Sequence, residues 1–282
     1  MDQRVGTYEE LAGYFGPGSV TWSHGGEAAL MLGGGRATLM QLAHPLVAAG
    51  VGQHSGYATD PWRRTSETTR LMLSLTFGTR SQAREAARAI NRMHLDVSGS
   101  LSQDTGALRA GSPYHARDPE LLLWVYATLV DTTRLMTRLL FKPLSPAEEE
   151  RYYQESKRIV ALLGLPDTRI PRTLADFNAY MATMLSAGSA LAWTPEAQRV
   201  ADIVMHMPAP FVLRPALLAA EQVTIGLLPQ RIRAIYGLRW DRYRQTALDL
   251  TFASLRLALA AVPAPLRQMP AARRARRRMR VP

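Results

Sequence analysis

Histidine is the residue type best placed to carry chemistry in this chain, which contains six histidines and no cysteine. His94 lies in the segment 81–97, where small or apolar residues recur at steps of three and four and arginines fill the opposite face. Ile90 precedes His94 by four residues and Val97 follows it by three, so His94 lies on the apolar face of the predicted helix. Such a histidine is either a hydrogen-bonded core residue or a metal ligand, and spacing alone leaves both open.

His44 presents the same choice near the end of a helix-like segment over residues 27–50. Three consecutive glycines, 33–35, interrupt this segment, and Pro45 removes a backbone donor directly after the histidine. Each glycine in a helix costs up to about 1 kcal/mol relative to alanine, so the run either breaks the helix or permits a close approach. The segment is therefore either a broken helix packed on a neighbour or a kinked wall of a cofactor pocket.

A polar segment over residues 53–64 contains His54 and leads into a predicted helix that carries Arg64 and Thr68. A separation of four residues places this guanidinium and this hydroxyl on one helical face. Together they could bind an anionic or oxygen-containing ligand such as a haem propionate. An ordinary structural role, including a salt bridge, fits the same spacing.

Several kinds of site are excluded by what the sequence lacks. Without cysteine there is no disulfide, thiolate zinc site, iron–sulfur cluster, thiolate-ligated haem or covalently attached c-type haem. The chain also lacks the phosphate-binding loop, the dinucleotide fingerprint, the serine hydrolase elbow and the H-E-x-x-H zinc motif. No histidine follows a glutamate by three residues, which argues against a carboxylate-bridged di-iron bundle.

The elements that must position these side chains are predicted to be helices, because helical periodicity dominates and strand alternation is nearly absent. A capping-box pattern, Ser145-Pro146-Ala147-Glu148, starts one of them. Besides the segments above, we expect helices over residues 118–140, 145–163, 173–186, 195–205, 212–228 and 243–260, with a linker at 166–171. The predicted fold is all-α, a single multi-helix domain.

Composition and charge limit the partners. The 282 residues are 47% hydrophobic and 20% charged, as in a globular protein. Seven of the arginines lie in the last 17 residues, so the net charge of +11 leaves +11 − 7 = +4 for the rest. We therefore expect a disordered basic tail over 263–282 and no specific nucleic-acid partner. The first residues lack a signal-peptide core and no long uncharged apolar run occurs, which favours a cytoplasmic protein and leaves only peripheral membrane contact open.

A series of short motifs occurs in a fixed order along the chain. They are Gln41-Leu42-Ala43-His44-Pro45-Leu46-Val47-Ala48-Ala49-Gly50-Val51, Asp60-Pro61, Arg64-x-x-x-Thr68, Phe77-Gly78, His94 and Gly99. A weaker continuation, Tyr114-x-Ala116-x-Asp118-Pro119 and Leu123-Trp124-Val125, follows. In order and spacing these motifs resemble the catalytic domain of the MpaB/rubber-oxygenase family, which includes the latex-clearing proteins. The resemblance covers roughly residues 23–250.

This resemblance implies an all-α domain over residues 23–262 around one non-covalent haem b, with globin-like helix packing as one arrangement and residues 1–22 as an extension. His94 matches the proximal iron ligand, and Arg64 and Thr68 match polar residues of the haem pocket. His44 and His54 are further candidates for that pocket, His44 also for a catalytic role with Arg64 and Thr68. The implied activity is an oxygenase (oxidoreductase) reaction of dioxygen with an apolar substrate, such as an isoprenoid or another alkene.

Two departures from the family pattern concern the pocket. Rubber oxygenases have a lysine directly before the matching threonine, where this chain has Glu67. Many members have a histidine near the position of Trp124, where this chain has Tyr126. Polyisoprene cleavage is therefore not predicted. Two alternatives remain: a haem-binding or gas-sensing module without turnover, and a cofactor-free helical interaction protein.

Overall fold

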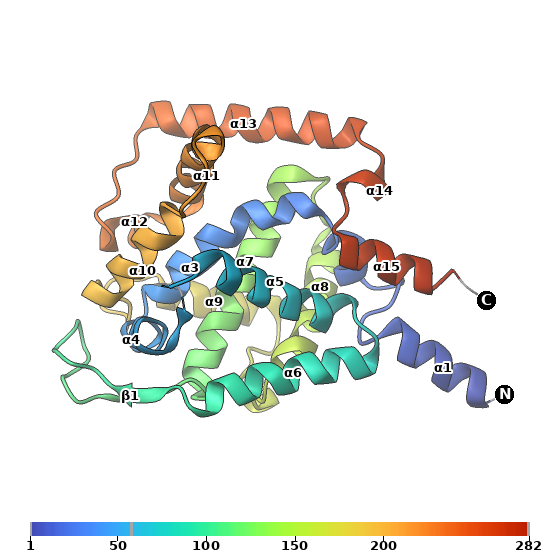
Figure 1. Ribbon diagram of the computed structural model, residues 1–282, viewed down its shortest axis with the longest axis horizontal. Coiled ribbons are helices and arrows are strands. Elements are labelled where there is room, and N and C mark those ends of the chain that lie inside the picture. The colour runs from blue at the N-terminus through green and yellow to red at the C-terminus, as the bar shows by residue number, and fades with distance from the viewer. Residues whose placement is uncertain (1, 57–58, 281–282) are drawn as a thin grey trace.

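The computed structural model describes residues 2–56 and 59–280, and this part of the chain is helical apart from one short hairpin (Figure 1). The all-α prediction is confirmed. The elements are α1 (Asp2–Ala12), α2 (Val20–His24), η1 (Ala28–Gly33), α3 (Gly34–Leu42), α4 (Pro45–His54), α5 (Pro61–Phe77), α6 (Arg80–Leu95), β1 (Ser98–Ser100), β2 (Pro113–His115), α7 (Pro119–Leu140), α8 (Pro146–Leu162), η3 (Asp167–Arg169), α9 (Leu174–Met184), α10 (Pro195–Met205), η4 (Phe211–Leu213), α11 (Arg214–Leu227), α12 (Gln230–Ile235), α13 (Arg242–Ala261), α14 (Ala264–Arg267) and α15 (Pro270–Arg278).

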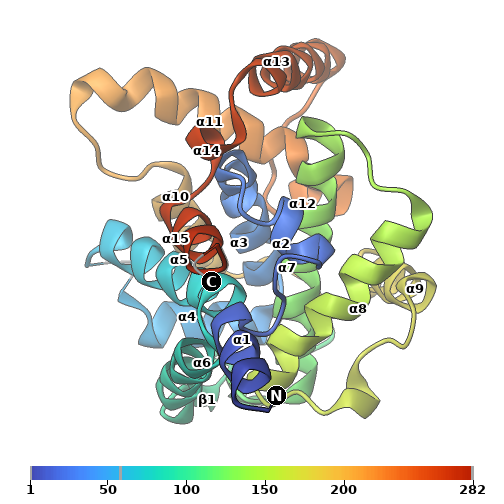
Figure 2. The same ribbon diagram turned by 90° about the vertical axis from the view of Figure 1, so that its right-hand side faces the viewer.

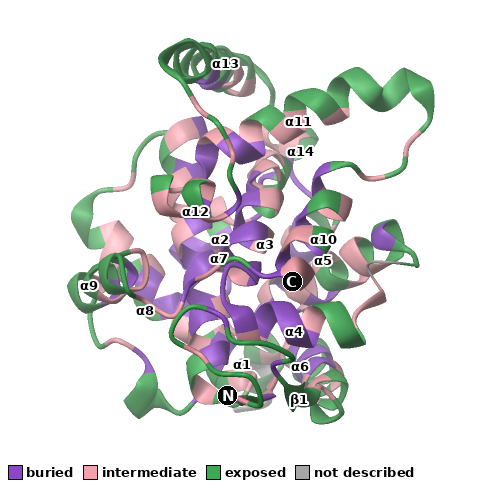
Figure 3. Ribbon diagram, turned by 90° about the vertical axis from the view of Figure 1, so that its left-hand side faces the viewer, coloured by how far each residue is buried: buried purple, intermediate pink, exposed green. Residues whose placement is uncertain are grey.

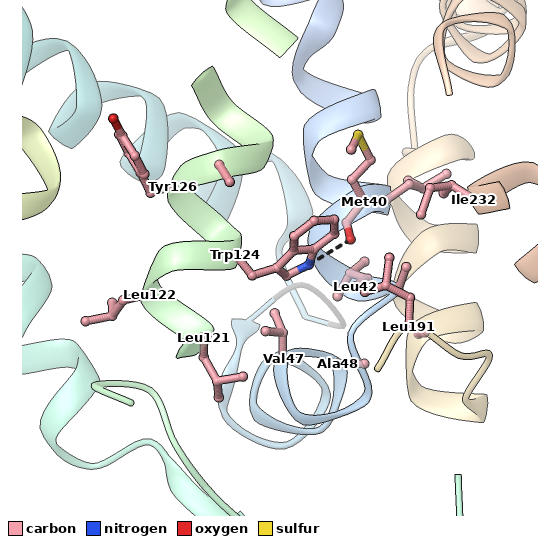
Figure 4. Close-up of a cluster of buried hydrophobic side chains, with 14 of the residues drawn as sticks. Met40, Leu42, Val47, Ala48, Leu121, Leu122, Trp124, Tyr126, Leu191 and Ile232 are labelled. Carbon is pink, nitrogen blue, oxygen red and sulfur yellow. Dashed lines mark hydrogen bonds between the residues drawn. The ribbon is translucent and has the colours of Figure 1, made fainter. Parts of the chain in front are cut away.

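Helix α7 forms the centre of the molecule, and α3, α8, α13 and η1 pack around it (Figures 1 and 2). Pro119 fits the first helical turn, and the Asp118 side chain accepts a hydrogen bond from the backbone N–H of Glu120 at 2.8 Å. Trp124 is fully buried, and its indole N–H donates to the carbonyl of Met40 on α3 at 3.1 Å (Figure 4). This bond fixes the register between α7 and the segment that leads to His44.

The glycine run breaks a helix and packs against neighbours. Helix α3 starts at Gly34, directly after η1, and a side chain at Gly35 would overlap Thr224 of α11. A side chain at Gly33 would likewise collide with Thr132 and Met136 of α7. Of the two interpretations of this segment, the structure supports the broken helix, because the glycines permit close approach of other helices.

Helices α5 and α6 pair as an antiparallel hairpin. Asp60 caps α5 by accepting from the backbone N–H of Arg63, and Thr79 forms a capping box with Gln82 at the start of α6. At a rise of about 1.5 Å per residue, Arg64 and His94 lie at similar distances from the connecting turn. The hairpin therefore brings the first turns of α5 beside the last turn of α6.

The basic tail differs from the sequence prediction of disorder, which is wrong for residues 264–280. Ala272 and Ala275 of α15 are fully buried against Trp22 and Phe77. Their spacing of three gives α15 one small apolar face on which it can approach α2 and α5 closely. The Arg278 guanidinium donates to the carbonyls of Leu11 and Phe77 at 2.8 and 2.9 Å, and Arg267 pairs with Glu27 at 3.0 Å. Arginines that looked like a solvated end thus also bind backbone and carboxylate groups of the body.

A smaller difference concerns the linker at 166–171, which contains the short turn η3. Among the described residues, no helix is both long and apolar enough to cross a bilayer.

Candidate functional site

His94 lies in the last turn of α6, half-buried, and its ring nitrogen Nδ1 has no hydrogen-bond partner among the described residues. Burial lowers the pKa of His94 below its ordinary value, and electrostatic interaction with Arg64, His115 and Arg117 lowers it further. The imidazole is therefore held neutral around pH 7. A neutral imidazole with an unpartnered nitrogen is the form of histidine that binds metal ions.

Arg64 and Thr68 are joined to each other on α5. The guanidinium of Arg64 donates to the Thr68 hydroxyl at 2.9 Å, and that hydroxyl donates to the Arg64 carbonyl at 2.9 Å. Nε of Arg64 also approaches the hydroxyl of Ser55 at 3.4 Å. No carboxylate of the described residues pairs with Arg64, so its positive charge is not neutralised by an ion pair within this part of the chain.

The neighbouring Arg63 behaves differently. Its side chain is well exposed and pairs with Asp60 at 3.6 Å and with Glu67 at 3.2 Å. Glu67 is therefore engaged by a surface arginine.

The hairpin of β1 and β2 supplies the other cationic neighbours. Gly99 of β1 pairs with Tyr114 of β2, and Ser98 pairs with His115. His115 and Arg117, together with Arg64 of α5, are the side chains whose electrostatic effect lowers the pKa of His94. Sequence reasoning missed His115 and Arg117, although both lie within the motif around Tyr114 and Asp118 that the resemblance includes.

The structure places His44 in a different environment. His44 occupies the N-cap position of α4 without a side-chain capping bond, is 7% exposed, and its Nδ1 is also buried without a partner among the described residues. Burial lowers its pKa to about 4, while the negative charge of Asp118 acts in the opposite direction. The ring borders a cavity of about 260 Å³, which is lined by His44, Pro119, Glu120, Leu123, Arg169, Tyr180, Met184 and Ala190.

His54 lies at the end of α4 and is exposed. Its Nε2 forms a hydrogen bond of 3.1 Å with the carbonyl of Ser98, and its ring meets the edge of the Tyr114 ring. These contacts tie α4 to the hairpin. Of the polar segment 53–64, Tyr57 and Ala58 lie outside the described residues.

Tyr126 is buried between α7 and α8, where its hydroxyl bonds that of Ser156 at 2.7 Å. Burial raises the pKa of Tyr126 far above its ordinary value. On α7 it points away from the side chain of Trp124 (Figure 4), and none of its described contacts involves His94 or Arg64.

The donor set fits a haem. The part of the chain that the structure describes contains no cluster of three or more metal-binding side chains, and a haem iron needs only one such ligand from the protein. His94 offers an unpartnered neutral imidazole, and the surrounding cationic groups suit the two anionic propionates that every haem b carries.

The fold is helical, and its candidate site combines a buried, unpartnered nitrogen of His94 with the guanidinium of Arg64, which forms no ion pair within the described part of the chain. Comparison with known proteins identifies the family. Residues 21–262 match the family model described as "ER-bound oxygenase mpaB/B'/Rubber oxygenase, catalytic domain", and the chain belongs to this family of oxygenase catalytic domains.

Two mycobacterial relatives are similar over most of their length. They are uncharacterized protein Mb2261 of Mycobacterium bovis and uncharacterized protein Rv2237 of Mycobacterium tuberculosis. Each is 31% identical over 233 residues, which cover 80% of this chain and 87% of the relative. No solved structure matches the chain significantly.

Proposed function

We propose that this protein is a haem b-dependent oxygenase that acts with dioxygen on a small apolar substrate, with His94 as the iron ligand. The observation that carries the proposal is the buried, unpartnered Nδ1 of a neutral His94 beside Arg64, in a chain that belongs to an oxygenase family. Haem, when bound, supplies an iron centre at which dioxygen is activated.

His94 is a better candidate for the ligand than His44, although both imidazoles are neutral and unpartnered at Nδ1. The charges around them decide the choice. The guanidinium groups of Arg64 and Arg117 act on the pKa of His94, whereas the charged neighbour that acts on the pKa of His44 is the carboxylate of Asp118. The two arginines beside His94 attract propionates, whereas the carboxylate of Asp118 near His44 does not.

Each side chain then has a stated role. His94 supplies a lone pair without first losing a proton, because burial and the nearby positive charges keep it neutral. Arg64 and Arg117 supply positive charge for the propionates. Thr68 accepts a hydrogen bond from the Arg64 guanidinium and so restrains its orientation.

The cavity beside His44 suits a small apolar molecule with a polar end. Leu123, Met184 and Ala190 supply apolar surface, and His44 lies at the wall of the cavity. We assign substrate binding to this cavity and a polar role in the reaction to His44. His54 contributes to the site by holding the hairpin that carries His115.

The test is the haem content of purified protein after expression with haem available. The wild-type protein should bind haem b in an equimolar amount and show an intense Soret band. The haem content of His94→Ala should be less than about a tenth of the wild-type value, because the iron loses its proposed side-chain ligand. Consumption of dioxygen with candidate alkenes then separates an oxygenase from a haem-binding module without turnover.

Two further variants distinguish the loss of an iron ligand from a general loss of folding. His206→Ala removes an exposed histidine at the end of α10, which has no role in the proposed site, and should keep full haem content. His94→Gly should regain a Soret band when free imidazole is added, because imidazole can occupy the space of the missing ring. Full haem content in His94→Ala would refute the ligand assignment, and a colourless wild-type protein would favour the cofactor-free alternative.

A further inference from the structure

The most exposed large hydrophobic side chains are concentrated in one part of the chain. Within the described residues, every such side chain that is at least 60% exposed lies between positions 211 and 266. They are Phe211, Val212, Leu218, Tyr243, Leu250, Leu257 and Leu266. Scattered exposed apolar residues are ordinary in water-soluble proteins, but a concentration of this kind marks an interaction surface.

The first part of this surface is the apolar tip, which we define as Phe211, Val212, Leu213 and Leu218. It lies on η4 and the first half of α11, which extends away from the body and is exposed to its end (Figure 3). Phe211 is 82% exposed and Val212 78%. From position 207 to 220 the only charged residue is Arg214, whose guanidinium lies 5.7 Å from the centre of the Phe211 ring. No element of the described chain covers these side chains.

The base of the tip is fixed to the body. The indole N–H of Trp62 on α5 donates to the carbonyl of Pro208 at 2.6 Å, and Trp62 itself is about half-exposed. This hydrogen bond fixes the chain just before the tip, so the tip projects from the body at a defined place.

Helix α13 supplies the second part. Its inner face is anchored by the buried residues Leu248 and Phe252, while Leu250 and Leu257 are exposed on the outside. An open groove of about 450 Å³ runs along it, lined by Leu250, Thr251, Ser254, Leu255 and Ala258. This helix is thus apolar on two sides, and only one of them is used to pack on the body.

We propose that the apolar tip and the outer side of α13 dock on the surface of an anionic lipid bilayer. Apolar side chains on a protruding turn can enter the boundary between headgroups and acyl chains, with arginine and aromatic side chains at headgroup level. Arg214 beside Phe211, and Arg242 at 4.9 Å from the ring of Tyr243, provide such pairs.

Charge favours a bilayer over a second copy of the chain. The chain over the apolar tip, residues 211–218, carries one basic and no acidic side chain, and α13 carries three basic side chains, Arg242, Arg244 and Arg256, against the single acidic Asp249. This region is therefore positive, in a chain of net charge +11. The same charge that attracts anionic lipid repels an identical surface. The docking requires no haem, so it is independent of the proposed function.

The test is co-sedimentation of the full chain with vesicles of phosphatidylcholine and phosphatidylglycerol. We expect binding that weakens with added salt, and a loss of at least about tenfold in Phe211→Glu, because a carboxylate replaces the most exposed aromatic of the tip. Tyr8→Glu is the matched control. Tyr8 on α1 is 56% exposed and lies on a different part of the molecule (Figure 1), so its variant should bind like wild type.

A second measurement reports insertion directly. Because the chain has no cysteine, Val212→Cys can be labelled with an environment-sensitive dye at that position alone. Its emission should shift to the blue with these vesicles, and that of labelled Tyr8→Cys should not. Undiminished binding of Phe211→Glu, no binding of wild type, or a wild-type dimer that Phe211→Glu dissociates would each overturn the proposal.

Discussion

The region around His94 and the region around His44 look alike in sequence and differ in structure. Each histidine lies on an apolar helical face, and each has a buried Nδ1 without a partner among the described residues. Burial lowers both pKa values. The charged neighbours have opposite signs: Arg64, His115 and Arg117 act on His94, and Asp118 acts on His44.

Besides Arg64 of α5, the charged neighbours of both histidines come from the segment between β2 and α7. His115 and Arg117 affect His94, whereas the next residue, Asp118, affects His44. One short segment therefore contributes a charged neighbour to each histidine. The sequences of α6 and α4 alone do not indicate which charge each histidine will meet. The comparison teaches that the sign of the neighbouring charge separates a histidine suited to an anionic metal group from one suited to a small, mainly apolar ligand.

The largest expected effect concerns the pH dependence of stability at His44. Above pH 6.5 its ring is neutral in both the folded and the unfolded chain. Between pH 6.5 and its folded pKa of about 4, the unfolded chain binds a proton that the folded chain excludes, so the free energy of unfolding falls as pH falls. A shift of this size corresponds to a loss of about 3 kcal/mol across that interval.

His44→Phe removes this titration, and the adjoining cavity gives the larger ring some room. Urea unfolding at pH 7 and pH 4.5, in the same cofactor state, should show a smaller acid loss for His44→Phe than for wild type. His54→Phe is the control, because His54 is exposed. Equal acid losses in all three proteins would remove the basis for treating His44 as a buried neutral ring.

A second prediction compares two adjacent arginines. Arg64→Met should weaken haem binding by about 10- to 100-fold, because a charge-assisted hydrogen bond contributes roughly 1.5–3 kcal/mol. Arg63→Met should change it by less than about fivefold, because exposed ion pairs such as those with Asp60 and Glu67 contribute little. Haem titration of the two variants measures both effects. A larger loss in Arg63→Met would place the haem away from the Arg64 side of α5.

Local signals predicted most of the fold. The capping box at Ser145 and the prolines at helix starts fixed where helices begin, and α10 runs over the expected residues 195–205. The tail was mispredicted for a physical reason. An Arg-rich segment with alanines three apart reads as a solvated end, and only the presence of Trp22 and Phe77 opposite Ala272 makes it a docked helix.

The candidate site could be predicted only in part. Periodicity placed His94 and His44 on inward faces, and spacing paired Arg64 with Thr68, which the structure joins by a hydrogen bond. Periodicity could not show which other elements would approach each histidine, because those contacts cross between segments far apart in the sequence. The cationic surround of His94 and the cavity at His44 are of this kind.

The smallest expected effect concerns Thr68. It tests whether the Thr68 hydroxyl affects the reactivity of the haem or only holds the Arg64 side chain. Thr68→Val keeps the approximate volume and removes the hydroxyl that accepts from Arg64 and donates to the Arg64 carbonyl. Arg64 keeps its positive charge without this bond, so haem content should stay within a few per cent of wild type in saturating haem. If the hydroxyl or the arginine that it restrains faces the reacting side of the haem, the rate at which the reduced haem is reoxidised in air should change severalfold. Thr69→Val, one residue further along α5, lies about 100° around the helix and should leave that rate unchanged. A wild-type rate in Thr68→Val would restrict Thr68 to holding Arg64, and an equal change in both variants would show a general loosening of α5 instead of a role for this hydroxyl.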